Sequence, residues 1–70
     1  MNERITLFVD VIIPVPIHRA FTYRLPFEMN EFVQIGARVI VPFGKAKLLT
    51  GLIVNIHENA PETYQAKYVE

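Results

Sequence analysis

The sequence contains no cysteine and no serine. Without cysteine, neither disulfides nor thiolate-bound zinc can supplement the small core that 70 residues can build. Without serine, the commonest hydroxyl nucleophile is missing. The only glycine followed by lysine, Gly44, lacks the further glycines and the Ser or Thr of a phosphate-binding loop. His18 and His57 do not have metal-ligand spacing. We therefore expect no catalytic residues, no metal site and no cofactor in this domain.

Excess charge is also lacking, because seven basic residues balance seven acidic ones. A protein that coats DNA regardless of sequence is normally basic, since phosphate neutralisation supplies most of its affinity. The apolar run over residues 5–16 is interrupted by Asp10 and is shorter than the roughly 20 residues of a membrane span. It also lacks the cleavage site of a signal peptide. These features predict a single soluble domain over residues 1–70, and the absence of cysteine fits a cytoplasmic protein.

Alternation of apolar and polar residues, with many β-branched side chains, predicts β-strands. Four are expected, with the start of a fifth near the end of the chain: residues 5–13, 21–25, 38–43, 48–57 and 66–69. The one short helical or turn-like stretch covers residues 27–32. Short strands at regular spacing indicate an all-β fold, a small OB-like barrel or sandwich of about five to six strands.

Proline and glycine mark the irregular positions. Pro14 and Pro16 should hold residues 14–17 extended, with a largely unpaired backbone. Gly36 is expected to form a turn with positive φ, and Gly51 a bulge or a close approach. In the fourth strand the apolar face is predicted to carry Leu52, Val54 and Ile56, with His57 exposed at the end.

Several side chains suit ligand binding, although each also has an ordinary structural explanation. Phe21 lies close to Arg19 and Arg24, an arrangement that suits base stacking beside a phosphate contact. Phenylalanines on alternating strands are, however, more often core residues. Gly44 suits either a tight turn or close approach of a ligand to the backbone. Candidate phosphate contacts, which are equally typical of solubilising surface residues, are Lys45, Lys47 and Lys67.

Two pairs of strings, taken together, resemble the N-terminal domain of the PriA replication-restart helicase family (primosomal protein N′). The first pair is VIIPVPI at 11–17 followed by RAFTYRLP at 19–26. The second is GARVIVPFGK at 36–45 followed by GLIV at 51–54. Their order and spacing agree with the family from about Val9 to Val69. The two pairs in register are more specific than any one of the strings alone.

The resemblance implies a module that binds the 3′ end of the nascent leading DNA strand at a stalled replication fork. It would direct a restart helicase during primosome assembly in the bacterial cytoplasm. The chain is then expected to be cut from the N-terminus of a longer ATP-dependent 3′–5′ helicase, whose ATP and zinc sites lie in the remainder. Expected partners are forked DNA with a free 3′ end, the other helicase domains, primosome proteins and single-strand-binding proteins, and no membrane.

The resemblance also implies the site residues. The aromatic wall of the terminal-base pocket falls on Phe21, its neighbour on Thr22, the close backbone contact on Gly44 and a lysine on Lys67. In the best-known member the residue after the aromatic is an aspartate, so Thr22 departs from that pattern. Further phosphate contacts would come from Arg19, Lys45 and Lys47.

Two other functions fit the same sequence. One is a protein-interaction β-barrel that adds a partner's strand to its edge. The other is an RNA-binding small barrel, because Gly-x-x-Val-x-Val patterns also occur in translation-associated domains. Strand-end capping explains the zero net charge, since it needs only one or two phosphate contacts and gains the rest from stacking.

Overall fold

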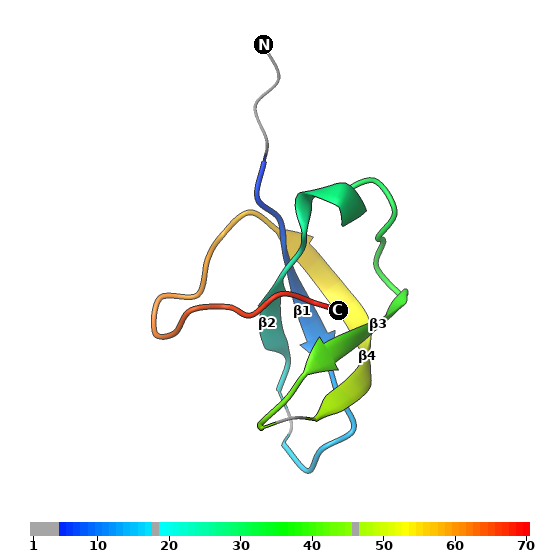
Figure 1. The fold of residues 1–70 in the computed structure, drawn as a ribbon, viewed down its shortest axis with the longest axis vertical. Helices are drawn as coiled ribbons and strands as arrows, with labels where there is room; N and C mark the ends of the chain where they lie inside the picture. The colour runs from blue at the N-terminus through cyan, green and yellow to red at the C-terminus, as the bar shows by residue number, and fades with distance from the viewer. Residues whose placement is uncertain (1–4, 18, 46) are drawn as a thin grey trace.

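The computed structural model describes residues 5–17, 19–45 and 47–70 and is an all-β fold (Figure 1). Its strands are β1 (Phe8–Ile12), β2 (Phe21–Arg24), β3 (Arg38–Pro42) and β4 (Leu48–His57). They pair antiparallel in the order β2-β1-β4-β3 and curl into a half-barrel, which confirms the OB-like expectation. The described residues form four strands rather than five or six. None of their helices is long and apolar enough to cross a membrane.

The end of the chain spans the opening between the two edge strands. Tyr68 forms a parallel bridge with Arg24 of β2, where the Arg24 amide donates to the Lys67 carbonyl at 2.7 Å. The Glu70 amide reaches the other edge and donates to the carbonyl of Ile40 in β3 at 2.8 Å. Figure 1 shows this segment running from β2 toward β3. The expected fifth strand is therefore present as a strand-like bridge of minimal length.

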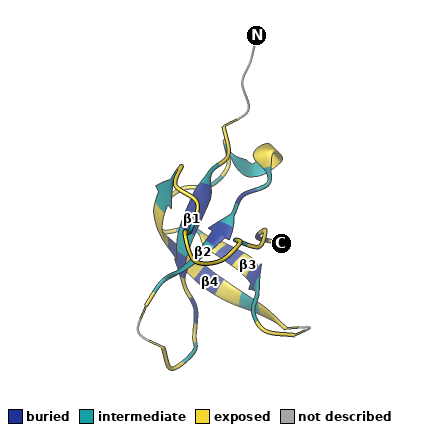
Figure 2. Cartoon of the chain, turned by 90° about the vertical axis from the view of Figure 1, so that its left-hand side faces the viewer, coloured by how far each residue is buried: buried dark blue, intermediate teal, exposed yellow. Residues whose placement is uncertain are grey.

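Buried residues occur in all four strands and alternate with more exposed ones (Figure 2). The least exposed side chains include seven residues in or beside β1, β2 and β3. These are Val9, Val11, Ile13, Tyr23, Leu25, Val39 and Val41. Ile53 of β4 and Val69 of the tail complete the buried cluster. Phe8 of β1 is buried too.

The predicted apolar face of β4 is wrong in part. Leu52 and Val54 are 43% and 41% exposed, whereas Ile53 is fully buried. The reason is an irregular register: Asp10 pairs with Asn55 and Val11 with Ile53, which leaves Val54 as an extra residue. Only beyond this bulge does Ile56 turn toward the core.

At Gly51 the backbone of β4 closely approaches side chains of and beyond β1, as the sequence predicted. A Cβ built there would collide with the side chain of Val11 and lie 2.9 Å from that of Ile13. The bulge itself lies three residues further on, at Val54. Gly36 has the expected positive φ of 93°.

The proline segment also differs from the expectation. The Val15 amide donates to the Ile13 carbonyl at 2.8 Å, and the Ile17 amide donates to the Val15 carbonyl at 2.7 Å. Each bond closes a three-residue turn around one proline, because the fixed φ of proline suits the centre of an inverse γ-turn. The backbone is therefore paired locally instead of extended and free. The helical or turn-like stretch expected over residues 27–32 contains a 3₁₀ helix at Phe27–Met29.

Candidate functional site

A pocket of about 160 Å³ lies along the outer edge of β2. Three segments far apart in the sequence surround it. They contribute Phe21, Thr22 and Tyr23 of β2, Pro42 at the end of β3 with Phe43 and Gly44 after it, and Tyr64, Gln65 and Lys67 of the tail. The tail reaches the pocket because its backbone is tied to Arg24 at the end of β2. The four site residues implied by the family resemblance, Phe21, Thr22, Gly44 and Lys67, all line this pocket.

Phe21 forms an aromatic wall that is held from two sides. Its ring meets the ring of Phe43 edge to face, with centroids 5.3 Å apart and an interplanar angle of 74°. The guanidinium of Arg19 lies 5.0 Å from the Phe21 centroid, within cation–π distance. Phe21 also packs against the core while remaining partly exposed. Phe21 therefore packs against the core and also lines the pocket.

Gly44 adopts a positive φ of 69°, which an L side chain rarely takes. A Cβ built there would meet no atom of the described residues within 4 Å. The backbone conformation, not crowding by the protein, therefore favours glycine, and the space above it is open. The side chains of Lys45 and Lys47 are exposed and lie outside the pocket lining.

Tyr64 is a pocket residue that the sequence reasoning missed. Its hydroxyl accepts a hydrogen bond from the Thr22 amide at 3.2 Å, which satisfies a backbone donor on the open edge of β2. Tyr23 lies behind it and donates its hydroxyl to the Pro42 carbonyl at 2.9 Å. Burial, with a smaller effect from Tyr64, raises the pKa of the Tyr23 hydroxyl above 10.0. An aromatic residue in an otherwise polar turn was the available signal for Tyr64.

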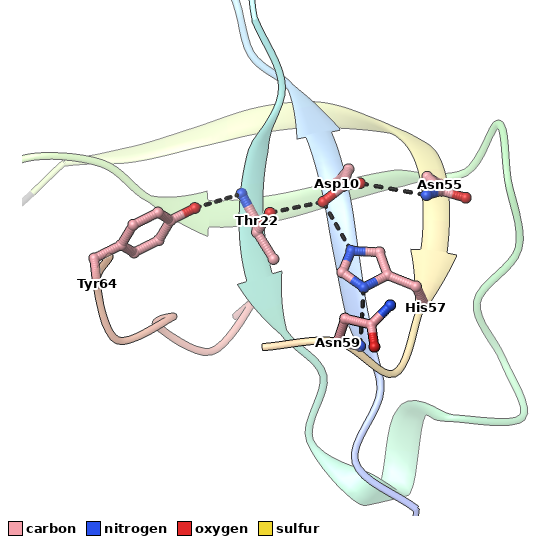
Figure 3. A network of polar contacts seen from close by, with 6 residues as sticks. All are labelled: Asp10, Thr22, Asn55, His57, Asn59 and Tyr64. Atoms are coloured by element: carbon pink, nitrogen blue, oxygen red, sulfur yellow. Dashed lines mark hydrogen bonds and ion pairs between the residues drawn. The ribbon is translucent and has the colours of Figure 1, made fainter. Parts of the chain in front are cut away.

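A polar network on the outer face of the sheet adjoins the pocket through Thr22 (Figure 3). The Thr22 hydroxyl donates to Asp10 Oδ1 at 2.7 Å, and His57 Nε2 lies 3.0 Å from the same oxygen. Asn55 Nδ2 donates to Asp10 Oδ2 at 3.4 Å. The Asn59 amide donates to His57 Nδ1 at 3.1 Å. Side chains of β2 and β4 thus converge on the carboxylate of Asp10 in β1.

Asp10 is ionised more readily than a free aspartate. Partial burial, the largest single effect, raises the pKa of its carboxyl. The hydrogen bonds from Thr22 and His57, the charge of His57 and the hydrogen bond from Asn55 together outweigh burial. They hold the pKa below 3.8, so the group carries its negative charge at neutral pH.

His57 ends β4 as predicted, but its side chain is only 22% exposed. Its ring stacks on Phe8 with centroids 6.2 Å apart, in addition to its contact with Asp10. The expectation of a freely exposed histidine is therefore wrong. His18 lies outside the described residues. Within 5–17, 19–45 and 47–70, no three His, Cys, Asp or Glu side chains gather as a metal site would require.

The pocket and its position on the barrel can be compared with known families. Residues 10–70 match the family model of the 3′DNA-binding domain (3′BD) of PriA. The chain belongs to this family. The match begins within β1, and the 3′BD region therefore includes every element that lines the pocket. Neither the curated proteins nor the solved structures include a match to the chain.

Proposed function

We propose that this 3′BD binds the free 3′ end of a DNA strand, with the terminal nucleotide in the pocket beside β2. The observation that carries the proposal is the convergence of Phe21, Thr22, Gly44 and Lys67 on one pocket from three separate segments. An aromatic ring, an open glycine backbone and a cation are the groups that a base, its sugar and a phosphate require.

Each group has a defined part in this proposal. Phe21 stacks on the terminal base, a contact worth about 1–3 kcal/mol. Gly44 lets the nucleotide approach the backbone, and Lys67 meets a phosphate. Arg19, whose guanidinium lies over the Phe21 ring, brings a second cation close to this aromatic wall. Lys45 and Lys47 lie outside the lining and would meet only more distant phosphates.

The balanced charge of the domain agrees with end capping. A chain with seven basic and seven acidic residues has no excess charge with which to coat a strand. Neutralising one or two phosphates gives a slope of log affinity against log salt of about −0.7 to −1.4 for a single strand. We expect affinity in the micromolar range or weaker, supplemented in a longer protein by linked domains.

In the setting of a replication-restart helicase, the module directs the enzyme to the nascent leading strand at a stalled fork. A linked motor would bind elsewhere on the same DNA, and the 3′BD would add a requirement for a nearby strand end. The module would thereby take part in primosome assembly in the bacterial cytoplasm. Its partners would be forked DNA with a free 3′ end, the other helicase domains, primosome proteins and single-strand-binding proteins.

Fluorescence anisotropy of labelled single strands tests the proposal. The strands end in a 3′ hydroxyl, a 3′ phosphate or a 3′-blocked hairpin, and an RNA of the same sequence is added for comparison. We expect only the free hydroxyl to bind well, with a shallow salt slope. Equal binding of all DNA ends with a steep slope would contradict end recognition, and equal binding of RNA would favour the RNA-binding alternative.

Phe21→Ala and Phe32→Ala form a matched pair for this assay. Phe32 is 80% exposed and lies outside the pocket lining, so its loss should leave affinity within about twofold. Phe21→Ala should weaken binding of the hydroxyl-ended strand about 5- to 150-fold, the equivalent of one stacking contact. Equal affinities of the two variants would reject the pocket as the binding site.

A further inference from the structure

The network around Asp10 fixes the direction of its hydrogen bonds. The Asn59 amide can only donate, so His57 Nδ1 must be the acceptor in their 3.1 Å contact. In the neutral ring the proton then lies on Nε2, which points at Asp10 Oδ1 from 3.0 Å. His57 is therefore a donor to Asp10.

The same oxygen also receives the hydroxyl proton of Thr22 at 2.7 Å. An ionised carboxylate can only accept hydrogen bonds, and the lowered pKa of Asp10 keeps it ionised at neutral pH. A hydroxyl has a single proton, so the proton of Thr22 is committed to Asp10. Toward any other group that reaches it, Thr22 Oγ1 offers only lone pairs.

Thr22 is also one of the residues that line the pocket. Its register partner across the β1–β2 ladder is Asp10, so the carboxylate lies one strand behind the pocket wall. A ligand atom that contacts Thr22 Oγ1 must therefore donate a hydrogen bond. A ligand carrying negative charge at that point would also be repelled by the nearby carboxylate.

We propose that Asp10 is a positioning residue that makes Thr22 a hydrogen-bond acceptor, so that the pocket selects a strand end that donates, such as a 3′ hydroxyl. The inference rests on the proposed function, and it adds how the end is recognised. His57 supports the arrangement, because its Nε2–H donates a second hydrogen bond to the same oxygen, Asp10 Oδ1. A terminal 3′ phosphate is disfavoured because it is mostly a dianion at neutral pH, which has no proton to donate and adds like charge.

The test measures binding of four DNA strands that differ only in the last 3′ substituent: hydroxyl, fluoro, hydrogen or phosphate. Fluorine is close to a hydroxyl in size but donates no hydrogen bond. The parent domain should prefer hydroxyl over fluoro and over hydrogen by about three- to tenfold, the range of one hydrogen bond. It should disfavour phosphate most strongly.

Three variants assign this preference to the Asp10–Thr22 pair. Thr22→Val should bring the hydroxyl-to-fluoro ratio close to one, whereas Thr22→Ser should retain the parent ratio. Asp10→Asn should reduce the discrimination against phosphate, because charge is lost and an amide can also donate to Thr22. If Asp10 acts in folding alone, Asp10→Asn should weaken the binding of all four DNA strands equally and leave the ratios of their affinities unchanged.

Thr50→Val is the matched control, because Thr50 is an exposed β-branched residue of β4 outside this pocket. It should leave every ratio at the parent value. A double variant, Thr22→Val with Asp10→Asn, should show no further change in the hydroxyl-to-fluoro ratio beyond Thr22→Val alone.

The outcomes separate this inference from the proposed function. If Phe21→Ala weakens binding but the parent does not distinguish hydroxyl from fluoro, the pocket stands and the role of Asp10 and Thr22 is refuted. Retention of the full phosphate discrimination by Asp10→Asn would refute it too. If Phe21→Ala binds like the parent, both proposals fail. Should Asp10→Asn not fold, Thr22→Val and Thr22→Ser still decide the question.

Discussion

Two hollows on this small barrel differ in size and in chemistry. The pocket beside β2 has a volume of about 160 Å³, and a second hollow on the outer face of β1, β3 and β4 has about 380 Å³. The larger one is lined mainly by aliphatic groups, with Arg38 and Thr50 as its polar side chains. Its lining consists of Ile12, Ile13, Pro14, Arg38, Thr50, Gly51 and Leu52.

The smaller pocket is the better candidate site because its chemistry converges. Phe21 and Phe43 form a fixed aromatic pair, Gly44 leaves its backbone open, and Lys67 adds a charge. The larger hollow offers apolar surface but few groups that would orient a nucleotide. Volume alone therefore does not identify the site, and four predictions follow from the contrast between the two regions.

The largest effect is expected at Gly51, which lies in the floor of the larger hollow. Gly51→Ala should lower the free energy of unfolding by about 1–3 kcal/mol, because its Cβ would overlap the side chains of Val11 and Ile13. Urea denaturation measures the change. Strand-end affinity of the folded variant should stay within about twofold of the parent, since this hollow is not the binding site.

The glycine of the smaller pocket should behave differently. Gly44→Ala should cost about 1–2 kcal/mol of stability, because alanine resists a φ of 69° although no described atom blocks its Cβ. Gly44→Asn is the matched control, since asparagine tolerates this conformation better. It should be more stable than the alanine variant and yet bind the strand end more weakly, because its side chain occupies the space above the backbone. If both variants bind like the parent, close approach at Gly44 is wrong.

The network behind the pocket predicts how stability depends on pH. The pKa of Asp10 is lowered by folding, so its contribution is present above 3.8 and is lost as pH falls through the folded-state pKa. Asp10→Asn should flatten the fall in melting temperature over that acidic window. The effect should be smaller than those of the glycine variants, because the Asp10 side chain is 24% exposed. An unchanged acid limb in the variant would show that the network does not stabilise the carboxylate.

The smallest effect concerns a single phosphate contact. Lys67→Ala should make the slope of log affinity against log salt shallower by about 0.7. Lys47→Ala is the control, because this exposed lysine lies outside the pocket lining and should leave the slope nearly unchanged. Equal slopes for both variants would remove Lys67 from the proposed site.

Much of this fold was predictable because strand alternation and turn residues act locally. The bounds of β4 and the turn at Gly36 follow from the sequence, as does the close approach at Gly51. The exposed face of β4 did not, because the bulge at Val54 is set by pairing with β1 and changes which residues face inward. The alternation of residues within one strand does not show how that strand pairs with another strand far away in the sequence.

The residues of the candidate site were likewise predictable only in part. The family resemblance named four residues that the structure brings to one pocket, but it gave no reason to include Tyr64. Nor did it indicate Asp10, which reaches Thr22 only through the β1–β2 register. The resemblance had an aspartate at the position of Thr22, and here Thr22 donates to the carboxylate of Asp10 on the adjacent strand. Contacts across strands need the fold before they can be seen.

The most direct test of the account is an NMR titration of the ¹⁵N-labelled domain with a short DNA strand that ends in a free 3′ hydroxyl. The account predicts the largest shifts at the backbone amides of Phe21, Thr22, Gly44 and Lys67, and little change for the same strand with a 3′ phosphate. Shifts centred on Thr50 and Leu52, or shifts independent of the strand end, would contradict the assignment of this pocket as the 3′-end site.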